Sequence, residues 1–371
     1  MILSNGTNDI FKNHEGLQYL VIAGYSIIFV LGVVGNSFVI FVVMRSRHMR
    51  TITNIFISNL ALSDIIMCLI AVPFTPIALF MNNWTLPASL CKVLPMTMGV
   101  SVYVSTLTST AIAIDRFFII VHPFIPRMKN SLCGFIICVI WIIAILISLP
   151  LAVYQTKRND LQSNTSKCQE VWPIDSSREV FTFVSFVLQF VLPCSIISVC
   201  YFKISKILRE RCKSKVGSGT KSIRGKEGEI KRKRKTNKML IAMVTIFVIC
   251  WIPLNSLWMA TDMSMNFKYD LRLQFFFPIG FFICHMIAMS SAVYNPFLYA
   301  WLNDNFKREF RNLVPCLSCI LKPVLPNNPS VTCRPDSRIA TTYQMTTCEQ
   351  EEDSSKKTLL PNSDSHIGLV N

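Results

Sequence analysis

Charged residues are scarce in this sequence, and the patterns typical of enzymes are missing. Of the 371 residues, 16% are charged and 51% are hydrophobic, a balance that excludes an ordinary soluble protein. The chain has no glycine-rich phosphate loop, no paired Cys-x-x-Cys motifs and no recognisable nucleophile–base pair. No apolar segment precedes Asn5, so the first long hydrophobic run is expected to act as a signal anchor. We therefore expect neither catalysis nor a structural metal site.

The hydrophobic residues gather in seven blocks of about 20 residues or more, the length that a helix needs to cross roughly 30 Å of hydrocarbon. The expected spans are 19–44, 54–81, 91–121, 131–151, 180–204, 237–261 and 275–302. They predict an all-α membrane protein, a seven-transmembrane helix bundle over residues 19–304 that follows an N-terminal tail at 1–18. A transporter is disfavoured because the number of spans is odd and the sequence shows no internal repeat.

The formal net charge is +16, and its placement predicts the orientation of the bundle. Basic residues cluster after spans one, three, five and seven, most densely at Lys231–Lys235. Because loops rich in Lys and Arg stay in the cytoplasm, we expect a multi-pass protein of the cell membrane with its N-terminus outside and its C-terminus in the cytoplasm. Charges that flank membrane spans indicate contact with anionic lipids, and we expect no nucleic-acid partner.

Candidate glycosylation and disulfide sites agree with this orientation. Asn5 and Asn164 begin Asn-x-Ser/Thr motifs in segments expected outside the cell, where glycosylation occurs. Most of the 14 cysteines lie in spans or on the cytoplasmic side, where thiols stay reduced. Only Cys91, at the outer end of span three, and Cys168, in the second outer loop, are expected in an oxidising compartment. We predict that these two cysteines form a disulfide.

Span two carries a carboxylate in the middle of the membrane. Asp64 lies about ten residues into the span, which corresponds to a depth of roughly 15 Å. Four polar residues of other spans can converge with it: Asn36, Ser105, Ser291 and Asn295. Because an unpaired buried carboxylate is costly, the cluster favours a small hydrated site that holds a sodium ion. A structural hydrogen-bond hub is the alternative.

Prolines interrupt spans five, six and seven, and an arginine ends span three. Pro193, Pro253 and Pro296 each remove a backbone hydrogen bond, and they predict bends about which a helix can swing. Prolines are also simply common in membrane helices, which is the alternative. Asp115-Arg116 lies at the predicted cytoplasmic boundary, where Arg116 either serves as a contact for a partner protein or is an ordinary snorkelling arginine.

Together these motifs resemble the rhodopsin-like (class A) G-protein-coupled receptors. The matching residues are Gly35-Asn36, Leu60–Asp64, Asp115–Phe117, Trp141, Pro193, Tyr201, Cys250–Pro253, Asn295–Tyr299 and the cysteines 91 and 168. The resemblance implies a receptor that activates a heterotrimeric G protein through a set of switch residues: Asp115, Arg116, Tyr201, Phe247, Pro253, Asn295, Pro296 and Tyr299. The chain departs from the family at Phe117, usually a tyrosine, and at Thr106, where a bulky aliphatic residue commonly packs against Pro193 and Phe247.

Within that family the chain is most similar to the neuropeptide Y and neuropeptide F receptor group. Gln189, His285 and Asp262 match polar pocket residues of the group, and the resemblance implies that Asp262 binds an arginine beside the amidated, aromatic C-terminus of a peptide. A carboxylate suits this role because it can bind a guanidinium through two hydrogen bonds. Further ligand contacts are expected at Met98, Trp258, Trp251 and Asn255. Met98 and Trp258 depart from the glutamine and asparagine common in the group.

Other ligands and other roles for these residues stay open. Met98 takes the place of the aspartate of amine receptors, and Met289 takes the place of the opsin lysine, so both subclasses are excluded. A receptor for a lipid or another small molecule remains an alternative. His285 can instead be a core histidine, Asp262 a solvated acid, and Gln189 a cap on a polar gap between helices.

The cytoplasmic segments predict further partners. Residues 305–320 are expected to form an amphipathic helix with Phe306 and Phe310 towards the bilayer, followed by palmitoylation at Cys316 and Cys319. The tail at 321–371 is predicted to be disordered and to bind arrestin and receptor kinases. No acidic residue ends span six, where Lys233 and Lys235 would repel Arg116, so we expect Arg116 to rest on Asp115.

Overall fold

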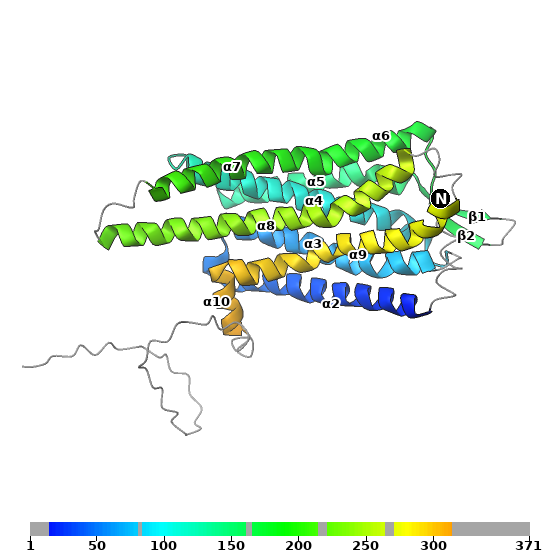
Figure 1. The fold of residues 1–371 in the computed structure, drawn as a ribbon, viewed down its shortest axis with the longest axis horizontal. Coiled ribbons are helices and arrows are strands. Elements are labelled where there is room, and N and C mark those ends of the chain that lie inside the picture. Colours follow the sequence, from blue (N-terminus) through cyan, green and yellow to red (C-terminus); the bar gives the residue numbers. More distant parts are fainter. Residues whose placement is uncertain (1–14, 81–83, 161–164, 214–220, 264–270, 314–371) are drawn as a thin grey trace, which may run out of the picture. The chain divides into compact units, whose positions relative to one another are not determined.

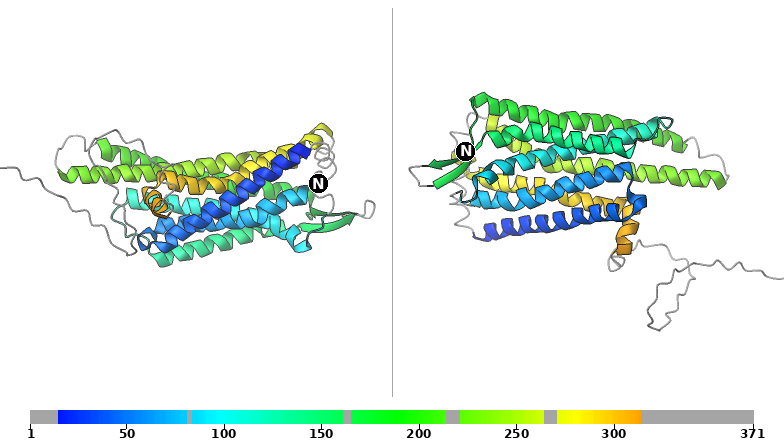
Figure 2. Two further views of the ribbon diagram at one scale, coloured as in Figure 1. Left: turned by 90° about the horizontal axis from the view of Figure 1, so that it is seen from below. Right: turned by 180° about the vertical axis from the view of Figure 1, so that it is seen from behind.

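Seven long helical segments lie side by side in a bundle (Figure 1; Figure 2). The computed structural model of the chain describes residues 15–80, 84–160, 165–213, 221–263 and 271–313. The segments are α2 (Glu15–Arg45), α3 (Ile52–Phe80), α4 (Ala88–Val121), α5 (Asn130–Val153), α6 to α7 (Asp175–Lys213), α8 (Lys221–Met263) and α9 (Leu271–Leu302). All seven are long and apolar enough to span a membrane, so the predicted seven-transmembrane bundle is confirmed.

The surface of the bundle is apolar where the sequence predicted contact with lipid. Large hydrophobic side chains such as Leu20, Phe135, Leu146 and Phe202 are exposed on the helices. Polar residues such as Asp64 are instead buried between them. An apolar exterior with the polar groups held in the interior is expected of a protein whose surrounding solvent is hydrocarbon.

The fifth span contains a widened turn in front of its proline. Helix α6 (Asp175–Phe186) leads into the π-helix η2 (Val187–Val191) and then α7 (Leu192–Lys213). The N–H of Leu192 bonds to the carbonyl of Val187, five residues earlier. Pro193 follows at once and has no N–H to continue the ladder, so the predicted irregularity at Pro193 takes the form of a π turn.

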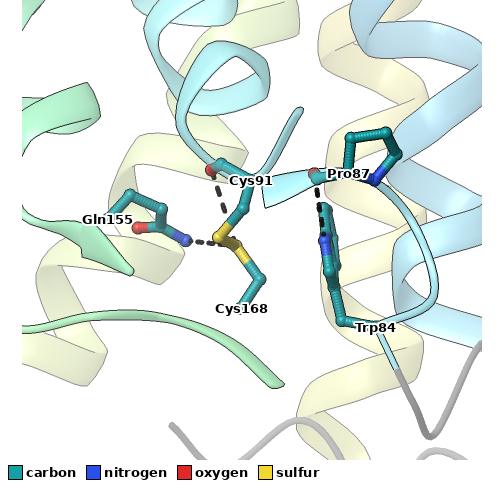
Figure 3. Close-up of a disulfide and its surroundings, with 5 residues drawn as sticks. All are labelled: Trp84, Pro87, Cys91, Gln155 and Cys168. Atoms are coloured by element: carbon teal, nitrogen blue, oxygen red, sulfur yellow. Dashed lines mark hydrogen bonds between the residues drawn. A yellow bond between two sulfur atoms is a disulfide. The ribbon is translucent and has the colours of Figure 1, made fainter. Parts of the chain in front are cut away.

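A β-hairpin covers one end of the bundle, which we call the hairpin end. Its strands β1 (Gln155–Asp160) and β2 (Thr165–Glu170) pair antiparallel, with Lys157 opposite Cys168. A disulfide joins Cys168 to Cys91 at the start of α4, as predicted (Figure 3). The N–H of Trp84 donates to the carbonyl of Ser166 over 2.7 Å, which ties the hairpin to the α3–α4 connection as well.

Two short helices mark the opposite end, which we call the α10 end. The 3-10 helix η1 (Arg47–Met49) links α2 to α3, and α10 (Asp304–Leu313) follows α9. The prediction that Phe306 and Phe310 face the bilayer is wrong, because both side chains are buried. The ring of Phe306 stacks on Tyr299 at 5.6 Å and that of Phe310 lies 4.7 Å from Phe38. Helix α10 lies against α9 and α2, so Tyr299 and Phe38 cover its apolar face.

Candidate functional site

Asp262 ends the sixth span at the hairpin end, and its carboxylate is already occupied. One oxygen, Oδ1, lies 2.8 Å from Nη2 of Arg178 on α6. The other oxygen, Oδ2, accepts a 2.8 Å hydrogen bond from the hydroxyl of Thr182, one turn further along α6. Only 5% of the side chain is exposed, so Asp262 is not a solvated loop acid. A ligand contact at Asp262 stays a prediction. The carboxylate already binds a guanidinium, that of Arg178.

Arg178 lies between two carboxylates. Its Nε is 3.4 Å from Oε2 of Glu170 at the end of β2, and the same oxygen accepts a 3.0 Å hydrogen bond from the indole of Trp172. Trp172 in turn lies between the rings of Tyr154 and Phe181, at 4.4 and 5.2 Å. Arg178 was not among the site residues predicted from the sequence. The spacing in the sequence could have indicated a shared partner, because Arg178 and Thr182 are four residues apart and lie on one face of a helix.

His285 is fully buried between α2 and α9. Its Nδ1 is 2.7 Å from the hydroxyl of Tyr25, and its ring stacks on Phe281 at 5.4 Å. Its Nε2 is buried and has no hydrogen-bond partner among the described residues. This packing agrees with the alternative of a core histidine, and a ligand contact at His285 stays a prediction. Tyr25 was missed because nothing in the sequence indicates which face of span one meets span seven.

Most of the remaining ligand candidates lie in one hydrophobic cluster. Trp251, Phe281, Trp258 and Met98 belong to this cluster, in which the rings of Trp258 and Phe281 meet edge to face at 5.6 Å. Trp251 donates from its indole to the hydroxyl of Ser291 over 3.1 Å. Asn255 donates to the carbonyl of Trp251 over 2.9 Å, so this hydrogen bond of its side chain stays within α8.

A small cavity lies next to the π turn of the fifth span. Gln189 is buried there. The cavity has a volume of about 10 Å³, near the lower limit for one water molecule, and Thr106, Gln189, Pro193 and Phe247 contribute to its lining. The hydroxyl of Thr106 donates only to carbonyls of its own helix, Val102 at 3.1 Å among them. The space is therefore where the family's bulky aliphatic residue would pack.

In the middle of the bundle the structure brings Asp64 and Asn295 together. The amide of Asn295 donates to Asp64 Oδ2 over 2.8 Å. Asn36 donates to the carbonyl of Ala292 over 2.9 Å. The hydroxyl of Ser291 accepts a hydrogen bond from the indole of Trp251. Ser105 is buried on α4. Among the residues that the structure describes, none of the ion pairs within 4.0 Å includes Asp64.

At the α10 end Arg116 is held by a threonine rather than by its neighbour. The guanidinium donates to Thr53 Oγ1 on α3. In the described part of the chain the ion pairs do not include Arg116 with Asp115, so the prediction of a direct pair is wrong. The physical reason is that adjacent side chains of a helix point about 100° apart, so Arg116 reaches Thr53 instead of Asp115.

The end of α8 that lies at the α10 end of the bundle is tied to α10. Lys235 forms an ion pair with Asp304, and Arg232 donates to the side chain of Asn305 over 2.6 Å. The sequence predicted that Lys235 would repel Arg116, but in the structure Lys235 has a carboxylate partner. The other switch residues, Tyr201 and Tyr299, are buried in the hydrophobic cluster of this end.

Several predicted sites lie outside the described residues. They are the glycosylation sites Asn5 and Asn164, the palmitoylation sites Cys316 and Cys319, and the tail at 321–371. All of them stay predictions.

Comparisons with known proteins agree on one family. The family model described as "7 transmembrane receptor (rhodopsin family)" matches residues 35–299. The chain is 35% identical to the neuropeptide F receptor of Drosophila melanogaster over 308 residues, which are 80% of this chain but 62% of that receptor. It is 34% identical to the human neuropeptide Y receptor type 2 over 306 residues, 81% of this chain and 77% of that receptor. The RYamide receptor of Tribolium castaneum is 33% identical over 324 residues, 84% of this chain and 85% of that receptor.

Proposed function

The chain belongs to the rhodopsin family of seven-transmembrane receptors, and from this premise we propose that it is a cell-surface receptor for an amidated neuropeptide ending in an Arg-aromatic pair. The names of the similar receptors support a peptide ligand, since they refer to neuropeptide F, neuropeptide Y and RYamide. The ligand class, the amidated C-terminus and an inhibitory heterotrimeric G protein are the finer parts of the proposal. A membrane receptor of this family is not an enzyme.

The observation that carries the proposal is the setting of Asp262. Its carboxylate is almost fully buried at one end of the bundle, and it faces a guanidinium over 2.8 Å. A carboxylate in such a place binds arginine better than lysine, because the planar guanidinium can use two donors at once. Trp258, on the same helix as Asp262, packs with Phe281 and Trp251 in one hydrophobic cluster, which suits the aromatic side chain next to that arginine.

We place the hairpin end outside the cell and the α10 end in the cytoplasm. The support is the concentration of Lys and Arg at the ends and connections of the α10 end, among them Arg45, Arg47, Arg127 and Lys235. Anionic lipids of the inner leaflet would attract these residues. Arrestin and receptor kinases are proposed partners of the tail on its composition alone.

Signalling then requires that peptide binding at the hairpin end changes the conformation of the α10 end. Bound peptide favours the conformation in which the sixth span swings about Pro253, with Phe247 and Trp251 beside the hinge. The swing separates the α10 end of α8 from its neighbours and releases Arg116 from Thr53 for contact with the G protein. Asn295, Pro296 and Tyr299 supply the matching weak point in the seventh span.

We further propose that Asp64 binds a sodium ion. Its buried carboxylate accepts from the neutral amide of Asn295, and Ser105 and Ser291 are buried polar residues of neighbouring spans. Carboxylate and hydroxyl oxygens are the ligands that a hard cation prefers, so the residues present fit the ion.

The test compares receptors in cells that report G-protein activation, using a short amidated peptide that ends in Arg-Phe. Asp262→Asn is expected to reduce the potency of this peptide at least tenfold while surface expression stays unchanged. Glu179→Gln is the control, since Glu179 is an exposed acid on the same helix as Arg178. Unchanged potency in the Asp262→Asn receptor would remove the arginine contact, and a response to lipids but to no peptide would move the assignment to a lipid receptor.

A further inference from the structure

Arg178 occupies the carboxylate that the ligand's arginine would need. We propose that Arg178 is an intrachain competitor for Asp262, which a ligand's guanidinium must displace from this carboxylate and which thereby lowers the affinity of the receptor for ligands that bind Asp262. The inference rests on the proposed function, because it assumes that Asp262 receives the arginine of the peptide. It adds a residue of α6 that sets the affinity of the site.

Asp262 cannot hold both arginines through paired hydrogen bonds. Oδ1 is taken by Arg178 at 2.8 Å and Oδ2 by the hydroxyl of Thr182 at 2.8 Å. A guanidinium that binds in the bidentate manner uses both oxygens of the carboxylate. Since the Asp262 side chain is 5% exposed, the ligand has no free side of the carboxylate to approach. Binding is therefore an exchange of one guanidinium for another.

Arg178 has somewhere to go when it is displaced. Its Nε is already 3.4 Å from Glu170, and a third of its side chain is exposed. Glu170 is held in place by the indole of Trp172, 3.0 Å away. A rotation of the long side chain towards Glu170 keeps the positive charge paired, so the exchange leaves no unpaired charge behind.

Only a ligand that carries a cation can open this carboxylate. A peptide that lacks a cation at the critical position offers nothing to replace Arg178, and Asp262 keeps its intrachain partner. An ammonium restores the charge but makes a point contact instead of the paired hydrogen bonds of a guanidinium. The apparent affinity for an arginine peptide is the intrinsic affinity multiplied by the fraction of receptors in which Asp262 is open.

The same ion pair can be interpreted as a tie between the fifth and sixth spans, since Arg178 is on α6 and Asp262 on α8. The two interpretations predict different results. Loss of a tie shifts the conformational equilibrium, and it changes the affinity of every agonist by a similar factor. Loss of a competitor increases the affinity only of ligands that use Asp262.

The experiment measures binding of two amidated peptides that differ at one position, one ending in Arg-Phe and the other in citrulline-Phe, which is neutral and nearly isosteric. The receptors carry an N-terminal epitope tag that reports the number at the cell surface. Arg178→Gln and Arg178→Ala are both tested, so that a folding defect in one does not decide the outcome. Arg158→Gln is the control, because it removes one positive charge from the exposed face of β1 at the same end of the bundle.

We expect both Arg178 variants to bind the arginine peptide about tenfold more tightly, and the citrulline peptide as the unmodified receptor does. The double variant Arg178→Gln/Asp262→Asn should lose the gain. An equal gain for both peptides, the same gain in Arg158→Gln, or no gain in either Arg178 variant at normal surface number would overturn the competition. If Asp262→Asn alone leaves the preference for arginine over citrulline intact, the proposed ligand contact fails instead, so the two failures are distinguishable.

Discussion

The amide of Asn295 donates a 2.8 Å hydrogen bond to the carboxylate of Asp64, a residue 231 positions earlier in the chain. The bond connects the second and seventh spans at a buried anion. Nearby, the seventh span approaches the first so closely that a Cβ at Gly35 would lie 3.0 Å from Pro296. The seventh span therefore contacts both the first and the second span, and four consequences of the structure can be measured.

Asp64→Asn should make agonist binding independent of sodium. In the unmodified receptor a sodium ion at Asp64 favours the resting conformation, so replacing sodium chloride with N-methylglucamine chloride should increase agonist affinity several-fold. The neutral amide of the variant has no charge to hold the ion. Binding assays in the two salts at equal ionic strength provide the measurement. An undiminished sodium effect in Asp64→Asn would place the ion elsewhere.

Thr106→Ile should stabilise the receptor. The added carbon atoms enter the cavity of about 10 Å³, and the lost hydroxyl bonds only to carbonyls of its own helix, so we expect a gain of about 1 kcal/mol. The melting temperature of detergent-solubilised receptor is the measurement. Thr110→Ile is the matched control, because Thr110 is buried one turn away and is not among the residues that line the cavity. There, the same addition should lower Tm through overpacking.

Tyr25→Phe should destabilise the resting receptor by about 1–3 kcal/mol, because it leaves Nδ1 of the buried His285 without its 2.7 Å partner. A lowered Tm of the ligand-free receptor is the expected result. Tyr19→Phe removes the same hydroxyl from an exposed position on the same helix and should have no effect. If the two variants behaved alike, the hydrogen bond seen in the bundle would contribute nothing to stability.

Lys235→Gln should increase basal G-protein activation, because it removes the ion pair that ties α8 to Asp304. Exposed pairs contribute about 0.2–1 kcal/mol, so the increase should not exceed a few-fold. Exchanging the charges, Lys235→Asp with Asp304→Lys, should restore the low basal level. Lys238→Gln, an exposed lysine on the same helix, serves as the control for loss of charge. Equal increases in both lysine variants would contradict a specific tie.

The sequence was sufficient for the features that the membrane imposes. The number and approximate limits of the spans follow from the thickness of the bilayer, and the disulfide between Cys91 and Cys168 follows from which cysteines are kept outside reducing compartments. The pairing of Asp64 with Asn295 was anticipated as part of a polar cluster, because buried polar groups in a membrane must find one another.

The partners of the other polar groups could not be predicted, because they depend on how each helix is rotated about its axis. Arg178 reaches Asp262, Tyr25 reaches His285 and Thr53 reaches Arg116 only in the packed bundle. The amphipathic pattern of α10 predicted a buried face but could not distinguish burial in lipid from burial against Tyr299. Periodicity gives the face of a helix, whereas the neighbour of that face comes from tertiary packing.

The most direct test is the distance between the α10 ends of α5 and α8 in the purified receptor, measured by electron paramagnetic resonance. Spin labels introduced through unnatural amino acids at Ser131 and Lys238, both exposed, report that distance with and without peptide. If an arginine bound at Asp262 swings the sixth span about Pro253, the arginine peptide should lengthen the distance by several ångströms. The citrulline peptide, and the arginine peptide on Asp262→Asn, should leave it unchanged. Equal lengthening by both peptides, or none by either, would contradict the account.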